Sequence, residues 1–286
     1  MKFVNSARWK IKRKPKTVFV LSGGAVRGAA QIGMLNVILS SGIKPDEVVG
    51  VSVGALNGFW LASSPSIERI QKMEKLWIEV ASEPPIRGNV LRTLTSILRG
   101  RPSFDTGERL KKILQNNLPI LNLEETEIPF HLGTTNASNG LMTWWERGVA
   151  LDLLCASAAI PGLLPAIQLE DGDYHLDGGV VSNIPLRKAV SLKPTRMIVF
   201  DVATGFLPPE KQTALSLMMV GFRAASAELT RQEWLDVPKN IEVLHIELPS
   251  PDAPLDIDFN GVPDLIKEGE KAAKAVLSES YNNVAR

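Results

Sequence analysis

The chain has 286 residues, of which 44% are hydrophobic and 22% charged, and its formal net charge is +1. This composition is ordinary for a globular protein, and the length is sufficient for one large α/β domain. No uninterrupted apolar run approaches the roughly 20 residues that span a bilayer. The single cysteine, Cys155, excludes an internal disulfide and a thiol-based metal site. We therefore expect a reducing compartment, the cytoplasm, and a small core residue at this position.

Positive charge is concentrated at the N-terminus. Residues 1–16 carry seven Lys/Arg and no acid, which leaves the remaining residues with a net charge of −6. This basic arm has neither the apolar core nor the cleavage site of a secretory signal. We expect either a solvated tail or an arm that contacts anionic lipid, with Trp9 as an interfacial anchor. Nucleic acid is not an expected partner, because no basic, aromatic-rich surface recurs later.

The first part of the chain predicts a parallel βαβ unit. An apolar, β-branched run at 17–21 predicts a buried strand, and a Gly-rich turn leads from it into a helix over 29–40. A second strand over 48–51 completes the unit as a parallel neighbour of the first. Dinucleotide binding is not favoured, because the third position of the Gly-x-Gly fingerprint holds Ala25 and the second strand ends at Ser52 rather than at an acid.

The remainder of the chain alternates between helical and extended patterns, without an internal repeat or a Gly/Ser-rich linker. We therefore expect one domain over 17–286. Helices are predicted over 66–81, 105–114, 149–159, 214–229 and 265–277, with a further helix beginning at 183–186. Strands are predicted over 129–136, 140–146, 196–202 and 241–248. This order predicts a three-layer α/β fold, a mostly parallel central sheet with helices on both faces.

Two apolar helical stretches leave their role open. Segment 86–104 has an apolar side flanked by arginines, including Arg92 and Arg99. Such a basic amphipathic segment is either a packed surface helix or a lid that touches lipid. The apolar stretch at 215–222 either packs in the core or lines an acyl-chain pocket.

The strongest chemical signal is the Gly-x-Ser-x-Gly sequence at Gly50–Gly54. It follows the apolar pair Val48-Val49 and precedes helix-forming residues, which predicts a sharp strand-to-helix turn that lifts the Ser52 hydroxyl clear of the sheet. A serine in this position can meet a base, and the following helix directs its positive end toward the site. By itself the pattern also fits a flexible Gly/Ser turn.

The Gly-rich turn after the first strand offers a second part of a reactive site. Because the first two strands are predicted neighbours, Gly23, Gly24 and Ala25 would lie beside Ser52, where their backbone N–H groups can stabilise an oxyanion. Arg27 falls in the first helical turn. We expect it to form a salt bridge or to brace the loop rather than to contact an ester.

Histidines and one aspartate are candidates for the base. His131 and His245 lie within strand patterns, where structural histidines are expected. His175 shares a strand face with Asp177, so a His175-assisted triad remains open. Asp177 is followed by the tight turn Gly178-Gly179, which lets its carboxylate approach a neighbouring site, and a carboxylate can itself act as a general base.

Taken together, these motifs resemble those of the patatin-like phospholipases. The shared elements, in order, are Gly23–Gly28, Gly50–Gly54 and Asp177-Gly178-Gly179, and the stretch Ala156–Pro161 is also similar to a segment of that family. The resemblance covers roughly residues 17–202. It implies a Ser-Asp dyad rather than a triad.

The resemblance also implies a role for each motif residue. Ser52 would be the nucleophile and Asp177 the base. The backbone of Gly23, Gly24 and Ala25 would form the oxyanion hole, with Arg27 as its basic companion. The motif glycines that would support these groups are Gly28, Gly50, Gly54, Gly178 and Gly179. Ala25 departs from the glycine usual in the family, and its methyl group could narrow the hole.

We therefore expect hydrolysis of a carboxylic ester of a phospholipid or lysophospholipid, without a metal or an organic cofactor. The expected location is the cytoplasm, with the protein either free or in peripheral contact with anionic membrane through the arm 1–16 and segment 86–104. Two alternatives remain open. One is an acyltransferase or thioesterase on the same scaffold, and the other is a non-catalytic lipid-binding protein that retains the motifs.

Overall fold

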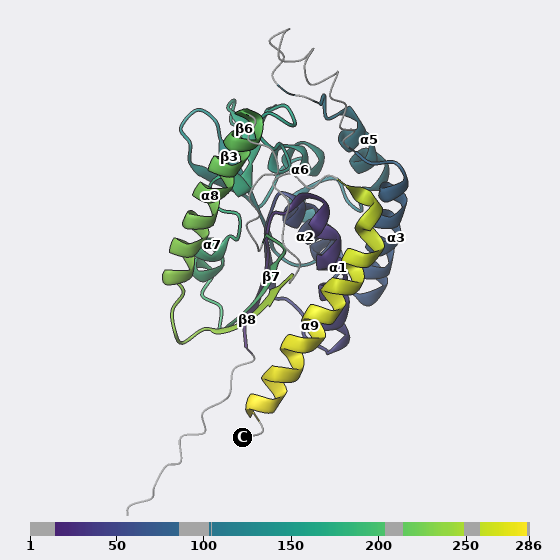
Figure 1. The fold of residues 1–286 in the computed structure, drawn as a ribbon, viewed down its shortest axis with the longest axis vertical. Coiled ribbons are helices and arrows are strands. Elements are labelled where there is room, and N and C mark those ends of the chain that lie inside the picture. Colours follow the sequence, from purple (N-terminus) through teal and green to yellow (C-terminus); the bar gives the residue numbers. More distant parts are fainter. Residues whose placement is uncertain (1–14, 86–102, 104, 204–213, 249–257, 285–286) are drawn as a thin grey trace, which may run out of the picture.

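The structure is a computed structural model, which describes residues 15–85, 103, 105–203, 214–248 and 258–284 (Figure 1). Its helices are α1 (Gly28–Ser40), α2 (Val53–Ser63), α3 (Ile67–Ser82), α5 (Glu108–Asn117), α6 (Ala150–Ser157), α7 (Leu186–Ser191), α8 (Ala214–Leu235) and α9 (Val262–Val284). Its strands are β1 (Thr17–Leu21), β2 (Glu47–Val51), β3 (Phe130–Asn136), β4 (Met142–Trp145), β5 (Ile167–Gln168), β6 (Tyr174–Asp177), β7 (Arg196–Asp201) and β8 (Glu242–Glu247). Nearly all of the basic arm and of segment 86–104 lies outside the described residues.

The sheet has a parallel centre and antiparallel additions at one end. β1 lies between β2 and β7 and runs parallel to both, and β8 extends β7 in parallel. β3 continues the parallel set beside β2. β4 and β6 pair antiparallel with β3, and β5 pairs antiparallel with β6. The prediction of a mostly parallel sheet is confirmed.

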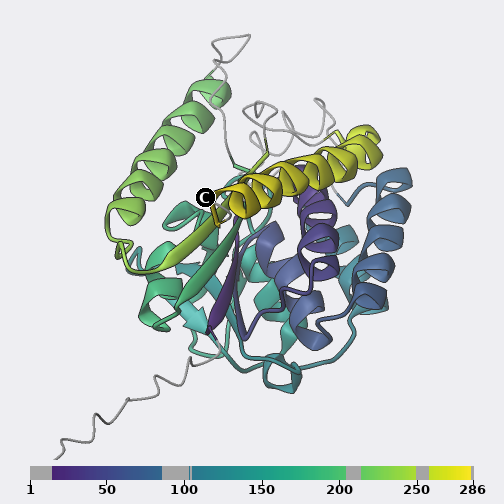
Figure 2. The same cartoon turned by 90° about the horizontal axis from the view of Figure 1, so that it is seen from below.

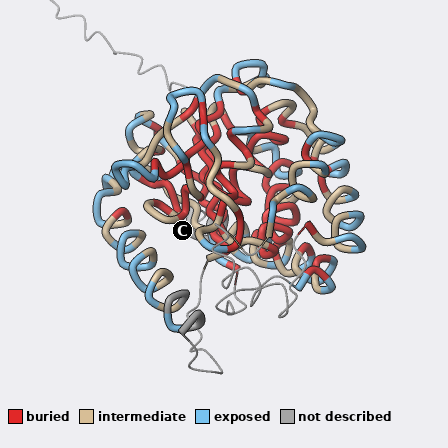
Figure 3. Tube along the Cα trace, turned by 90° about the horizontal axis from the view of Figure 1, so that it is seen from above, coloured by how far each residue is buried: buried red, intermediate tan, exposed pale blue. Residues whose placement is uncertain are grey.

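Alternate residues of the central strands pack on opposite faces of the sheet, as strand geometry requires. Phe19 and Leu21 belong to a core shared with α1, α2, α3, α6 and α9. Val18 and Val20 belong to a second core, which α7 and the end of α8 cover. Figure 2 shows these two helical layers on either side of the sheet, and Figure 3 shows the buried strands between them. The predicted three-layer α/β fold is confirmed.

Strand β3 brings the ends of β2 and β6 together. β2 pairs with β3 as far as Val51 opposite Gly133, and β6 pairs from the next position, Asp177 opposite Thr134. β4 pairs with residues 132–135 of β3, which overlaps both of these stretches. A strand has two edges, so β2 and β6 must follow one another along the edge that β4 does not occupy. The C-terminal end of β2 therefore meets Asp177 directly.

Most predicted elements are observed with small shifts at their ends. The helix expected at 183–186 begins at Leu186, because the Asn183 carbonyl instead accepts the Gly23 N–H group. The last helix begins earlier and continues further than the predicted 265–277. None of the described helices is long and apolar enough to cross a membrane.

Helix α9 crosses α1 with unusually close backbone contact (Figure 1). A Cβ atom at Gly33 of α1 would lie 2.0 Å from the Ile266 carbonyl oxygen, and one at Gly269 of α9 would lie 2.0 Å from the Ala30 carbonyl oxygen. These separations are shorter than any van der Waals contact. Glycine is therefore required at both positions for the C-terminal helix to dock on the helix that follows the Gly-rich turn.

We predict that Gly269→Ala lowers the free energy of unfolding by about 1–3 kcal/mol, because the added methyl group meets backbone rather than a side chain that can move. Gly221→Ala on α8 is the control, since nothing lies within 4 Å of its ideal Cβ position. This control should be neutral or stabilising by up to about 1 kcal/mol. Urea unfolding measures both variants, and equal effects would contradict the packing argument.

Candidate active site

The turn at Ser52 has the strained backbone that its sequence predicts. Ser52 has φ 53° and ψ −130°, and α2 begins at the next residue. Such angles in a non-glycine residue cost roughly 1–3 kcal/mol. The turn also requires close packing, because a Cβ atom at Gly54 would lie 2.3 Å from the Leu21 carbonyl oxygen at the end of β1. The structure thus holds the serine at the C-terminal edge of the sheet, at the positive end of α2.

A buried hydroxyl group holds this turn in place. The Ser52 N–H group donates to Ser157 Oγ at 2.9 Å, and Ser157 Oγ donates to the Gly133 carbonyl oxygen at 2.8 Å. Ser157 is fully buried at the end of α6. The contact connects the turn with α6 and β3. Sequence analysis did not predict it, since no local pattern indicates a bond between residues 105 positions apart.

The two predicted catalytic side chains contact each other. Ser52 Oγ donates a hydrogen bond of 2.6 Å to Asp177 Oδ2, and the Gly179 N–H group donates one of 2.7 Å to Asp177 Oδ1. Both side chains are buried. Close approach here depends on Gly178, where a Cβ atom would lie 2.4 Å from the Gly133 carbonyl oxygen. The pairing of β2 and β6 on β3 therefore places the carboxylate against the serine.

Burial raises the pKa of Asp177 to about 7, because water no longer solvates its ionised form. The hydrogen bonds from Ser52 and Gly179 favour the ionised form and partly oppose this shift. A general base works best when its pKa lies near the working pH. The carboxylate is therefore suited to accept the serine proton near neutrality.

The Gly-rich turn lies beside Ser52, but its N–H groups are not equivalent. The Gly23 N–H group donates to the Asn183 carbonyl oxygen at 3.0 Å. Within the described part of the chain, no partner accepts from the Gly24 or Ala25 N–H group. The Gly23 N–H group is thus engaged within the protein, whereas an oxyanion hole at Gly23, Gly24 and Ala25 stays a prediction. Gly23 is also a packing position, where a Cβ atom would lie 3.2 Å from Ser52 Cβ.

Arg27 braces this turn, as one of the two predictions for it stated. Its side chain is almost fully buried, and Nε donates to the Val202 carbonyl oxygen at 2.6 Å, just beyond the end of β7. Gly28 lets the first turns of α1 and α2 approach, because a Cβ atom there would lie 2.2 Å from Val53 Cγ2. The arginine thus supports the loop from beneath.

The histidines have other partners. His175 Nδ1 lies 2.9 Å from Thr134 Oγ1, and Nε2 lies 2.9 Å from Asp171 Oδ2. His131 and His245 are likewise paired with carboxylates. Among the described contacts, none joins a histidine to the serine, so the geometry favours the dyad over a His175-assisted triad.

Two other reactive groups in the described part of the chain have simple structural roles. Cys155 packs against the main core, and burial raises the pKa of its thiol to about 12. Asp201, His245 and Glu247 have the chemistry and spacing of metal ligands. Their ligand atoms are paired with one another, at 3.0 Å from His245 Nε2 to Asp201 Oδ2 and 3.7 Å from Nδ1 to Glu247 Oε1.

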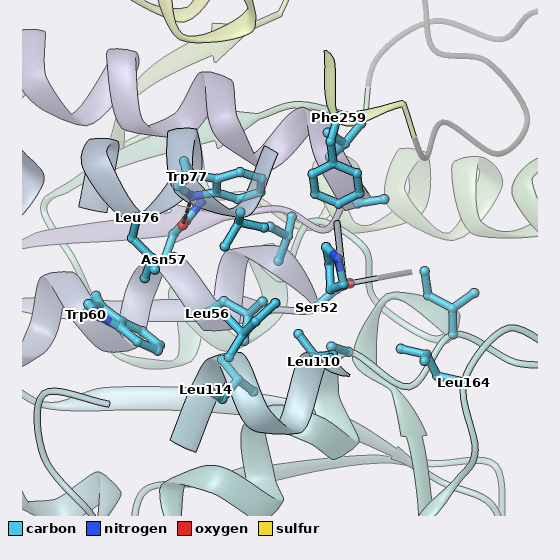
Figure 4. A pocket seen from close by; sticks show the side chains of 18 of the residues that line it. Ser52, Leu56, Asn57, Trp60, Leu76, Trp77, Leu110, Leu114, Leu164 and Phe259 are labelled. Carbon is cyan, nitrogen blue, oxygen red and sulfur yellow. Dashed lines mark hydrogen bonds between the residues drawn. The ribbon is translucent and has the colours of Figure 1, made fainter. Parts of the chain in front are cut away.

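An apolar pocket of about 140 Å³ opens at Ser52 (Figure 4). Its walls come from α2, α3, α5, the segment after α6, and Phe259; the lining side chains include Leu56, Trp60, Leu76, Trp77, Leu110, Leu114 and Leu164. None of the described residues of α8 lines it, and Leu217 of that helix is half exposed. Other helices thus line the pocket, and the described residues of the stretch 215–222, for which sequence analysis left an acyl-pocket role open, do not.

The wall of this pocket offers a ligand almost no free polar group. Besides the serine, Asn57 is the polar side chain among its described lining residues. Asn57 Nδ2 donates to the Gly28 carbonyl oxygen and to Gln31 Oε1, both at 2.9 Å, and Oδ1 accepts from Trp77 Nε1 at 3.1 Å. Gln31 Nε2 donates onward to the Ser22 carbonyl oxygen at 2.9 Å. This network was not predicted, and it connects the pocket wall with the Gly-rich turn.

Comparison with known proteins agrees with the motifs. The family model described as Patatin-like phospholipase matches residues 19–190. A putative patatin-like phospholipase domain-containing protein of Caenorhabditis elegans is 26% identical over 228 residues, which cover 79% of this chain and 20% of that protein. Patatin-like phospholipase domain-containing protein 7 of Rattus norvegicus is 27% identical over 186 residues, which cover 65% and 13%. The chain thus spans about a fifth or less of the length of these relatives.

A solved structure shares the fold. VipD from Legionella pneumophila superposes with a TM-score of 0.53 over 93% of this chain and 67% of that one, at 14% sequence identity. At this level of identity the likeness concerns the fold alone.

We predict that Ser157→Ala loosens the turn at Ser52. The variant leaves the Ser52 N–H group and the Gly133 carbonyl buried without this partner, which should lower the free energy of unfolding by about 1–3 kcal/mol. The displaced serine should react roughly tenfold to a hundredfold more slowly with a fluorophosphonate. Ser41→Ala is the control, because its hydroxyl bonds the Ile38 carbonyl at the exposed end of α1. Unchanged labelling and stability in Ser157→Ala would show that the Ser157 hydroxyl does not hold the turn in place.

Proposed function

This chain belongs to the patatin-like phospholipase family, whose model covers more than half of it, and on that premise we propose that it is a serine lipid acyl hydrolase with a Ser52–Asp177 dyad. Members of this family hydrolyse lipids. The observation that carries the proposal is the 2.6 Å hydrogen bond from Ser52 Oγ to Asp177 Oδ2 at the mouth of an apolar pocket. The substrate class is a carboxylic ester of a phospholipid or lysophospholipid.

The first half of the reaction forms an acyl-enzyme. The ionised Asp177 carboxylate accepts the Ser52 proton while Ser52 Oγ attacks the carbonyl carbon of the ester. The Gly24 and Ala25 N–H groups, together with the positive end of α2, stabilise the negative charge that develops on the carbonyl oxygen. Protonated Asp177 then transfers its proton to the leaving alcohol as the ester C–O bond breaks.

The second half releases the fatty acid. Asp177, ionised again, accepts a proton from a water molecule, and the resulting nucleophile attacks the acyl carbonyl. The same N–H groups stabilise the second tetrahedral intermediate. When that intermediate collapses, Asp177 returns the proton to Ser52 Oγ, so atoms and charges balance over the cycle and no cofactor takes part.

The pocket supports a lipid as the substrate. Its described lining side chains are apolar apart from Ser52 and Asn57, and the Asn57 amide is fully engaged within the wall. Transfer of hydrocarbon from water to such a surface is favourable, whereas a polar or charged group would lose its hydration there without gaining a hydrogen-bond partner. The acyl part of the ester therefore enters the pocket, and the alcohol part remains on the outer side of Ser52.

We predict that Ser52→Ala and Asp177→Asn each lower fatty-acid release from short-chain esters and phospholipid vesicles at least a thousandfold, because each removes a group that acts in the transition state. Asp173→Asn is the matched control, since this carboxylate lies in the same chain segment and bonds Asn136 and Ser138 instead. It should retain activity.

Other outcomes would assign a different function. Transfer of the acyl group to an added alcohol or thiol, in preference to water, would indicate an acyltransferase. A folded wild-type protein that cleaves no ester and does not react with a fluorophosphonate would be a non-catalytic lipid-binding protein.

We predict that kcat/KM rises with pH to a plateau above about pH 7, because Asp177 must be ionised to accept the serine proton.

The same raised pKa of Asp177 predicts an effect on stability. The native state keeps its Asp177 proton to higher pH than the unfolded chain, so this residue destabilises the fold increasingly between about pH 4 and pH 7. Asp177→Asn removes that penalty and should raise the free energy of unfolding at pH 8 by a few kcal/mol, with a smaller gain near pH 5. An Asp177→Asn protein that is less stable than wild type at pH 8 would refute this interpretation.

A further inference from the structure

The pocket extends along helix α2, away from the serine (Figure 4). Ser52, Leu56 and Trp60 are spaced by four residues, so they lie on one face of the helix, and all three line the pocket. Figure 4 shows Ser52 near one end, Leu56 between, and Trp60 at the other end. Eight residues of α-helix span about 12 Å, which is the advance along the helix axis from Ser52 to Trp60.

The far end of the pocket is walled by buried side chains. Trp60 of α2, at this end, is 7% exposed, and the lining side chains of the pocket also include Met73 of α3 and Leu114 of α5, which are 3% and 4% exposed. The Trp60 ring packs edge-on against Phe59 with 5.7 Å between ring centroids. An acyl chain that reaches this point meets a packed core, and the Trp60 indole is the largest group in its way.

Two independent estimates give the chain length that fits. A cavity of about 150 Å³ lined by apolar side chains is known to hold benzene, so the 140 Å³ observed here corresponds to about six carbon atoms. An extended chain advances roughly 1.2 Å per bond, judged from the spacing of the polypeptide backbone, so about 12 Å corresponds to roughly ten bonds. The estimates bracket six to ten carbons.

We propose that Trp60 sets the acyl-chain length, and that the pocket takes medium acyl chains of roughly six to ten carbons. The proposal rests on the proposed function and specifies its substrate class. A longer chain has to leave its terminal methylene groups in water or displace the indole from the core, and either event weakens transition-state binding. Trp60 is thus a specificity-determining residue, separate from the groups that perform the chemistry.

The test compares 4-nitrophenyl esters of 4, 8 and 16 carbons. Wild type should prefer the 8-carbon ester over the 16-carbon ester by about tenfold or more in kcat/KM, and Trp60→Ala should shift that ratio at least tenfold toward 16 carbons. Phe200→Ala is the control, because Phe200 is a buried aromatic on β7 that does not line the pocket. It should lose stability without a change in chain-length profile. Trp60→Leu and Leu114→Ala provide milder enlargements if Trp60→Ala does not fold.

A binding measurement separates this proposal from the proposed function. Methyl octanoate and methyl palmitate are titrated into Ser52→Ala protein, with and without Trp60→Leu, and heat release is measured. We expect methyl octanoate to bind more tightly than methyl palmitate, and we expect Trp60→Leu to abolish or reverse this preference. That result supports the length limit even if no ester is hydrolysed. Equal or weaker binding of methyl octanoate by the Ser52→Ala protein overturns the length limit, as does a wild-type kinetic preference for the 16-carbon ester. Failure of hydrolysis on every ester overturns only the proposed function.

Discussion

The proposed chemistry depends on one buried contact, the hydrogen bond between the Ser52 hydroxyl and the Asp177 carboxylate. A carboxylate buried in this way is destabilised in its ionised form, and the raised pKa of Asp177 expresses that penalty. Among the described residues, two partners oppose it, Ser52 and the Gly179 N–H group. A third strong donor would stabilise the charge further and weaken the carboxylate as a base. The small set of partners is therefore consistent with the role proposed for Asp177.

Strand β3 explains how residues so far apart in sequence are held at this separation. It offers adjacent positions, Gly133 and Thr134, to the ends of β2 and β6, and its Gly133 carbonyl also accepts the Ser157 hydroxyl that holds the Ser52 amide. One strand thus positions both side chains of the proposed dyad and the turn that presents one of them. The strained backbone at Ser52 persists because several long-range contacts determine it together.

The parts of the site that follow from local pattern were predictable. Period-2 burial, the Gly-x-Ser-x-Gly turn and the Asp-Gly-Gly turn each reflect short-range sterics, and their combination in order predicted Ser52 and Asp177 as a pair, which the structure brings into contact. Long-range contacts were not predictable from one sequence. The carbonyl of Asn183 accepts the Gly23 N–H group, and the hydroxyl of Ser157 accepts the Ser52 N–H group. The segments that form the pocket walls on α3 and α5 were predicted only as helices, since an apolar face does not reveal whether it packs tightly or leaves a cavity.

The lack of a histidine in the proposed dyad is consistent with the apolar lining of the pocket. A histidine-based triad needs polar groups that orient and solvate the ring, whereas the carboxylate here is oriented by one backbone N–H group and by the serine itself. This leaves the other side of Ser52 free of polar side chains, apart from the self-contained Asn57 network. Ser52 is common to both environments, because its hydroxyl bonds the carboxylate while its residue lines the apolar cavity. On the proposed mechanism, an acyl chain that fills the cavity therefore contacts Ser52 on its apolar side and does not compete for the carboxylate on the other side.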